Sequence, residues 1–127
     1  MAIDRNMNIL IVDDFAPMLV TMKNLLKKFE LQNVDGAENG AQALQMMRHK
    51  SYGLVLSDWD MEPVTGLELL QEVRKDDVLK GTPFILVTSQ DDGREIAAAA
   101  AAGVSAYIVK PFTESVLRDK IENVLGP

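Results

Sequence analysis

Several residue types that mark particular protein classes are absent or rare in this chain. The 127 residues include no cysteine, so disulfides and thiolate metal ligands are excluded. No apolar run approaches the roughly 18 residues of a membrane span, and the opening MAIDRNMN lacks the apolar core of a secretory signal. These absences suit a reducing compartment, and we expect a cytoplasmic protein with no membrane partner.

Basic residues are also fewer than acidic ones. Lysine and arginine number 13 against 19 aspartates and glutamates, which gives a formal net charge of -6, and no basic stripe is visible. Nucleic-acid binding depends on neutralising phosphates with lysine and arginine, so no nucleic-acid partner is expected. The acidic residues either keep the protein soluble or gather around a cation.

What the chain does contain is a regular alternation of apolar and amphipathic segments. The runs that predict strands are 8–12, 34–37, 53–57, 84–89 and 106–109. Segments with helical spacing or helix-forming composition follow each of them, and the first has an apolar stripe from Phe15 to Phe29 with Pro17 near its start. This alternation predicts an α/β fold, a parallel sheet with five helices on both faces. We expect one domain over 1–127, with its core at about 7–125.

Residues suited to helix capping stand before the later helices. Asn39 precedes the second helix, Thr65 stands three residues before Glu68 in a capping-box pattern, and Thr113 precedes the last helix. Asp91 or Asp92 is placed to cap the alanine-rich fourth helix. The turns between predicted strands and helices therefore have the chemistry that the α/β pattern requires.

Polar side chains follow four of the five predicted strands, at the point where each strand ends. Strand one runs into Asp13 and Asp14, strand three into Asp58, strand four into Thr88 and strand five into Lys110. Ligands of open α/β sheets bind outside these carboxyl ends. Neighbouring carboxylates repel one another unless a hard cation such as Mg²⁺ joins them, and a lysine suits an anion bound to that cation. The set predicts a phosphoryl site, although any single acid could equally cap a helix or form a turn.

Four segments together carry a family resemblance that covers nearly the whole chain. They are LIVDD (10–14), LSDWDM (56–61) followed by TGLELL (65–70), ILVTS (85–89) and AYIVKPF (106–112). The chain resembles the response-regulator receiver domain, and within that family the stand-alone chemotaxis type. The resemblance implies the strand order 2-1-3-4-5, a phosphoryl group taken from a histidine kinase, Mg²⁺ as cofactor, and binding to a protein target such as the flagellar motor switch. A phosphatase is a further partner, and we expect a monomer that catalyses only its own phosphorylation and dephosphorylation.

The resemblance also implies roles for individual residues. Asp58 would accept the phosphoryl group, and Lys110 would neutralise its oxygens. Thr88 would move to bond the phosphoryl group, Tyr107 would change rotamer as a switch residue, and the Lys110-Pro111 peptide would be cis. The implied Mg²⁺ ligands are Asp13, Asp14, Asp58 and the backbone carbonyl of Asp60.

Some positions depart from the family pattern or lie outside it. Proline comes one residue late in Met61-Glu62-Pro63, and Asp60 is acidic where the chemotaxis type commonly has asparagine. We hypothesise that Asp60 and Gln90, each two residues beyond a site residue, set how fast water hydrolyses the phosphorylated form. Val20, off the core stripe, is expected to be exposed.

Two other functions remain open at this point. The domain could act as a phosphorelay shuttle or phosphate sink, which the acids, Thr88 and Lys110 would serve equally well. The Asp58-x-Asp60 spacing also fits a small Mg²⁺-dependent phosphatase of the haloacid-dehalogenase type, with an aspartate nucleophile. In such enzymes, however, that pair follows the first strand, whereas here it follows the third.

Overall fold

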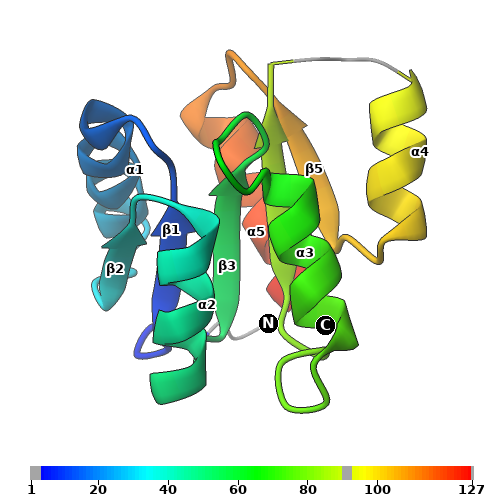
Figure 1. Cartoon of the computed structure of the whole chain (residues 1–127). Helices are drawn as coiled ribbons and strands as arrows, with labels where there is room; N and C mark the ends of the chain where they lie inside the picture. The colour runs from blue at the N-terminus through cyan, green and yellow to red at the C-terminus, as the bar shows by residue number, and fades with distance from the viewer. Residues whose placement is uncertain (1–3, 90–92, 127) are drawn as a thin grey trace.

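The chain folds as a five-stranded parallel sheet with helices on both faces (Figure 1). The computed structural model describes residues 4–89 and 93–126. The strands are β1 (Ile9–Val12), β2 (Val34–Ala37), β3 (Leu54–Asp58), β4 (Phe84–Thr88) and β5 (Ala106–Val109), and the helices are α1 (Ala16–Lys28), α2 (Gly40–His49), α3 (Gly66–Lys75), α4 (Gly93–Ala101) and α5 (Glu114–Leu125).

The strands lie in the order β2-β1-β3-β4-β5, and every neighbouring pair is parallel. This confirms both the α/β class and the 2-1-3-4-5 order. All five strands therefore present their carboxyl ends at one edge of the sheet, and this edge carries the polar residues singled out above.

Two apolar cores separate the sheet from its helices. Alternate residues of a strand point to opposite faces, so Leu10 and Val12 of β1 join one core while Ile9 and Ile11 join the other. Helices α2, α3 and α4 cover the first face, and α1 and α5 cover the second. Because both faces are covered, the central strands are apolar on both sides rather than alternating.

Side-chain caps begin three of the helices as the sequence predicts. Asn39 accepts from the Gln42 N–H at 2.8 Å, and Thr113 accepts from the Val116 N–H at 3.1 Å. Thr65 and Glu68 form a complete capping box at the start of α3. The expected cap at Asp91 or Asp92 lies outside the described residues.

Helix α1 begins differently from the expected pattern. Phe15 is 61% exposed and does not belong to the apolar stripe. The reason is that α1 begins only at Ala16, while the Phe15 N–H donates to the Asp13 carboxylate at 2.9 Å and Phe15 itself is extended. Val20 is exposed, as expected.

In the part of the chain that the structure describes, Glu62-Pro63 is a cis peptide, and so is Lys110-Pro111, as the resemblance implied. Among the described residues, no helix has the length and apolar character needed to cross a membrane.

Candidate functional site at the carboxyl edge of the sheet

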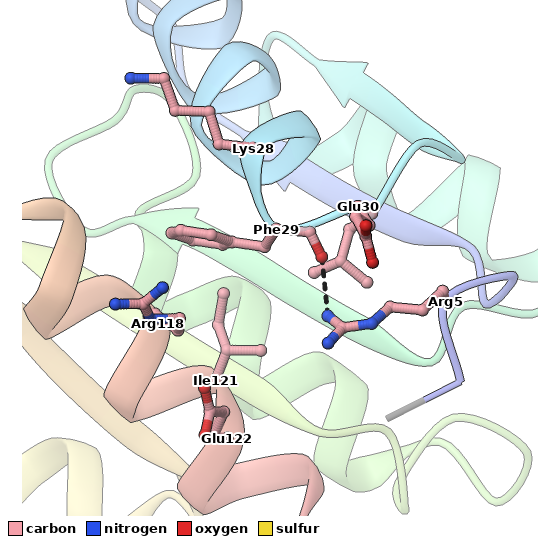
Figure 2. A pocket seen from close by; sticks show the side chains of 8 residues that line it. Arg5, Lys28, Phe29, Glu30, Arg118, Ile121 and Glu122 are labelled. Atoms are coloured by element: carbon pink, nitrogen blue, oxygen red, sulfur yellow. Dashed lines mark hydrogen bonds between the residues drawn. The ribbon is translucent and has the colours of Figure 1, made fainter. Parts of the chain in front are cut away.

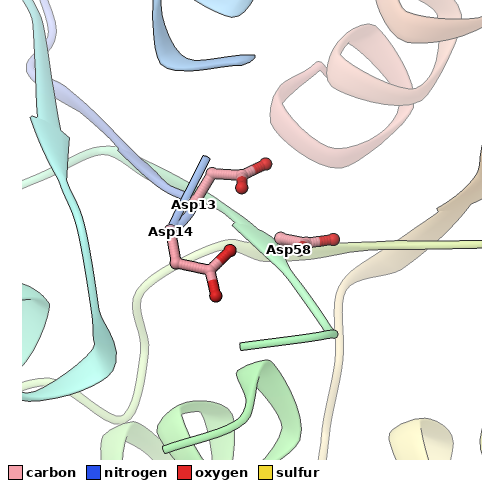
Figure 3. A group of neighbouring side chains, drawn as sticks. All are labelled: Asp13, Asp14 and Asp58. Atoms are coloured by element: carbon pink, nitrogen blue, oxygen red, sulfur yellow. The ribbon is translucent and has the colours of Figure 1, made fainter. Parts of the chain in front are cut away.

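Three carboxylates meet at the carboxyl edge of the sheet (Figure 3). Asp13 and Asp14 directly follow β1, and Asp58 is the last residue of the adjacent β3. One oxygen from each carboxylate lies within 4.8 Å of the others. Asp13 and Asp58 are buried whereas Asp14 is exposed, so the cluster reaches solvent on the side of Asp14.

A lysine completes the group from the neighbouring strand end. The Lys110 ammonium donates to Asp58 Oδ1 at 2.9 Å, and the Asp58 side chain is only 7% exposed. The Lys110 N–H also donates to the Thr88 carbonyl at 2.7 Å, which continues the β4–β5 pairing to the site. The structure thus brings together five of the predicted residues: Asp13, Asp14, Asp58, Thr88 and Lys110.

The electrostatics of this cluster favour the addition of positive charge. Burial raises the pKa of Asp58, and although contact with Lys110 lowers it, the net pKa stays above the ordinary aspartate value. Burial likewise raises the pKa of Asp13, against the lowering effect of the Phe15 N–H. Each carboxylate also disfavours ionisation of its neighbours. Carboxylate oxygens are the ligands that Mg²⁺ prefers, so the residues present fit that ion.

Removing one negative charge should therefore stabilise the protein when no metal is bound. A raised carboxyl pKa penalises folding at every pH above that pKa, and the penalty disappears as the pH falls through it. We expect Asp13→Asn to raise the free energy of unfolding in chelator at neutral pH, while keeping an oxygen for the Phe15 N–H. Urea denaturation with and without Mg²⁺ measures this.

The matched control is Asp77→Asn, because the Asp77 side chain is 97% exposed and its stability effect should be negligible. Mg²⁺ should stabilise the wild type more than Asp13→Asn, since the variant has lost a ligand. If the Asp13→Asn protein is no more stable than the wild type in chelator, the buried charge of Asp13 does not destabilise the fold.

Two contacts beside the site link segments that the sequence did not connect. The Ser89 hydroxyl donates to the Asp60 carboxylate at 3.1 Å, across the β3–α3 and β4–α4 loops. The Thr88 hydroxyl donates to Glu95 Oε2 in the first turn of α4 at 3.5 Å. Ser89 ends the segment ILVTS but had no role assigned to it, and Glu95 belongs to no motif, so no sequence signal predicted either contact. Gln90, the second residue expected to tune hydrolysis, lies outside the described residues.

The aromatic residues near the site have different environments. Trp59 follows Asp58, is 9% exposed and packs in the core beneath α2, α3 and α4. Its ring therefore covers the loop after β3 from the inside. Tyr107 is half-buried on β5, and the Lys120 ammonium of α5 lies 5.7 Å from the centre of its ring. The Tyr107 ring is therefore in reach of α5.

A separate pocket of about 190 Å³ lies between the C-terminal end of α1 and α5 (Figure 2). Arg5 and Arg118 flank Phe29: the Arg5 guanidinium donates to the Phe29 carbonyl at 2.7 Å, and the Arg118 guanidinium lies 5.7 Å from the ring centre. Glu30 and Glu122 also line the pocket and oppose its positive charge. This pocket does not include the acidic cluster.

Comparison with known proteins identifies the class that this fold and site define. The response regulator receiver domain model matches residues 9–122, and the chain belongs to that family. A chemotaxis protein CheY of Pseudomonas aeruginosa is 43% identical over 118 residues, which cover 93% of this chain and 95% of that protein. Chemotaxis protein CheY-3 of Vibrio cholerae is 39% identical over 122 residues, covering 96% and 94%.

Solved structures agree with the sequence comparison. Vibrio cholerae CheY4 superposes with a TM-score of 0.88 at 26% identity, covering 94% of this chain and 99% of that one. A putative response regulator from Chloroflexus aurantiacus gives a TM-score of 0.89, also at 26% identity, covering 96% and 99%. The protein is thus a response regulator of the two-component type, similar to chemotaxis receivers over most of its length.

Proposed function

We propose that the domain accepts a phosphoryl group on Asp58 from the phosphohistidine of a partner kinase. The observation that carries the proposal is the placement of Asp58: buried at the end of β3, in contact with Lys110, and within reach of two further carboxylates. Phosphoryl transfer requires mostly positioning and charge neutralisation, and this edge of the sheet supplies both.

The chemistry of the step follows from the residues. An Asp58 carboxylate oxygen forms a bond to phosphorus as the phosphorus–nitrogen bond of the donor breaks, and the imidazole nitrogen keeps the electron pair. Lys110 is placed to balance negative charge on the phosphoryl oxygens. Asp13, Asp14, Asp58 and the Asp60 carbonyl would hold Mg²⁺, which supplies further neutralisation of phosphoryl charge when bound. Attack of water on phosphorus later releases phosphate and restores the Asp58 carboxylate.

The phosphorylated domain would then change its binding to a protein target. The relatives named above are chemotaxis proteins, which favours a chemotaxis target such as the flagellar motor switch over a relay shuttle. Thr88 and Tyr107 would carry the change from Asp58 to the surface. In this proposal the domain acts only on its own aspartate, so it should not turn over an external phosphate ester.

Trp59 offers a direct test, because its backbone adjoins Asp58 and its ring is buried beside the site. We expect Trp59 fluorescence to change with Mg²⁺ and again with an acyl phosphate, and mass spectrometry to show one added phosphoryl group. Asp58→Asn should lose the second change and the added mass, whereas Asp119→Asn, at an exposed position of α5, should keep both.

Two results would count against this function. A phosphoryl group that still attaches to the Asp58→Asn protein would place the acceptor elsewhere. Catalytic release of phosphate from a simple phosphate ester by the wild type would favour the phosphatase alternative.

A further inference from the structure

Among the described residues, helix α4 has fewer buried residues than any of the other four helices. Of its described residues only Ala99 is fully buried, whereas α3 buries Gly66, Leu69, Leu70 and Val73. Its inner face is made largely of alanine, which has little apolar surface to bury. A hollow of about 450 Å³ separates α4 from β5 and α5, lined by residues such as Ile96 and Tyr107. Because α4 buries few residues along its length, the contacts at its two ends matter more for its position.

The C-terminal end of α4 is held firmly. The Arg74 guanidinium of α3 donates to the Gly103 carbonyl at 2.8 Å. Gly103 has a φ of 88°, a left-handed conformation that glycine adopts without strain. The Gly103 and Val104 N–H groups donate back to Ala100 and Ala99, both at 3.1 Å, which closes the last turn.

The N-terminal end has a weaker link, and this link leads to the phosphorylation site. Glu95 lies in the first turn of α4, and its carboxylate accepts from the Thr88 hydroxyl at 3.5 Å. That distance is at the long limit of a hydrogen bond, so the contact is easily exchanged for a better one. Thr88 is 2% exposed and ends β4, one residue beyond Val87, which pairs with Asp58.

We propose that Glu95 restrains α4 in the unphosphorylated protein by accepting this hydrogen bond, and that a phosphoryl group on Asp58 releases the restraint. The release rests on the function proposed above. A phosphoryl group adds about -1.5 to -2 charge and three strong acceptor oxygens. Thr88 has a single hydroxyl hydrogen to donate. Its transfer to the phosphoryl group removes the contact with Glu95, and the added charge repels the Glu95 carboxylate.

The consequence is a pivoting motion with a defined fixed point. The end of α4 at Gly103 stays bound to Arg74, while the first turn loses the hydrogen bond between Glu95 and Thr88. Glu95 is thus a positioning residue that acts through Thr88 and does not touch the reacting atoms. An element with two arrangements, biased by one local charge, is what a phosphorylation switch requires.

The first test uses the unphosphorylated protein, so its outcome does not depend on phosphoryl transfer. We measure hydrogen–deuterium exchange of the α4 amides. Glu95→Ala should accelerate this exchange about fivefold, the effect expected for one weak hydrogen bond to a charged group. Glu95→Gln keeps an acceptor oxygen and should stay near the wild type. Glu72→Ala, which removes an exposed carboxylate from α3, is the control and should leave α4 unchanged.

Glu95 could also stabilise α4 through the helix dipole, because any carboxylate in a first turn does so. Repeating Glu95→Ala in a Thr88→Val protein separates this effect from that of the hydrogen bond. Thr88→Val should itself accelerate α4 exchange, and adding Glu95→Ala to it should then produce little further change. The same fivefold factor in both backgrounds would show that Glu95 acts only through the dipole and would overturn the proposal. An unchanged exchange rate in Glu95→Ala would do so as well.

The second test adds an acyl phosphate and Mg²⁺, with phosphoryl incorporation at Asp58 followed by mass. Phosphorylation should accelerate α4 exchange in the wild type, and the added acceleration should be less than half as large in Glu95→Ala. If the wild type takes up the phosphoryl group and its α4 amide exchange does not change, phosphorylation does not release the restraint by Glu95. No incorporation at all would overturn the proposed function and the release together, while the Thr88→Val comparison would still decide whether the restraint exists.

Discussion

Gly66→Ala is expected to lower the free energy of unfolding by about 3 kcal/mol and to slow phosphorylation of Asp58 severely. Gly66 is the first residue of α3, and its N–H donates to the Trp59 carbonyl at 3.0 Å. A Cβ at this position would overlap the Asp58 carbonyl and lie 2.9 Å from Trp59 Cα. Because these atoms belong to the backbone, a side-chain rotation cannot relieve the overlap, and α3 or the end of β3 must shift.

The chain offers two graded controls for this substitution. Gly40 begins α2 as Gly66 begins α3, but a Cβ there would lie 2.8 Å from a Val64 side-chain carbon, so Gly40→Ala should have a smaller effect. A Cβ on Gly81 would meet nothing within 4 Å, and Gly81→Ala should be nearly neutral. Chemical denaturation ranks the three variants by their free energy of unfolding. Phosphorylation by an acyl phosphate measures whether Asp58 still accepts the phosphoryl group. A Gly66→Ala protein with wild-type stability and phosphorylation would show that the approach of α3 to β3 is not required.

The part of the site that lies at strand ends was predictable from the sequence. A polar residue directly after an apolar strand has its position set by the sheet, and in a parallel sheet all such residues reach the same edge. Asp13, Asp58 and Lys110 were identified in this way, and the structure places the Lys110 ammonium on Asp58. The strand order was not contained in the residue pattern and came from the family resemblance.

The contacts made by loops were not predictable in the same way. The Ser89–Asp60 and Thr88–Glu95 hydrogen bonds depend on the paths of two loops, and serine, aspartate and glutamate occur at many exposed positions without such partners. Phe15 was placed on the wrong surface for a related reason. Helical spacing extends the apolar stripe back to Phe15, but the Asp13 carboxylate binds the Phe15 N–H and delays the helix by one residue.

Arg74 is a further example of a residue that only the structure reveals. Arg74 lies in the last turn of α3, where any cation interacts favourably with the helix dipole. In the structure its guanidinium also donates to three carbonyls beyond α3: Gly103 at 2.8 Å, Lys80 at 2.9 Å and Thr82 at 2.6 Å. One side chain therefore joins the α3–β4 loop to the turn that follows α4.

Arg74→Ala is expected to lower the free energy of unfolding by about 2 to 3 kcal/mol, because three carbonyls lose a charged donor. Arg48→Ala is the matched control, since Arg48 occupies the last turn of α2 but is exposed, and its loss should cost about 0.5 kcal/mol. Arg74→Lys should recover little, because an ammonium cannot reproduce the fork geometry of a guanidinium. Urea denaturation measures the three changes.

Arg74→Ala should also change the motion of α4 in a way that distinguishes it from Glu95→Ala. Loss of the Arg74 hydrogen bond to Gly103 frees the end that the pivot requires to be fixed, so amide exchange should rise most in the last turn of α4 and at Gly103 and Val104. Loss of Glu95 should instead act most strongly at the N-terminal half of the helix. If both variants accelerate exchange uniformly along α4, the helix opens as one unit and its two ends do not have the separate roles assigned to them.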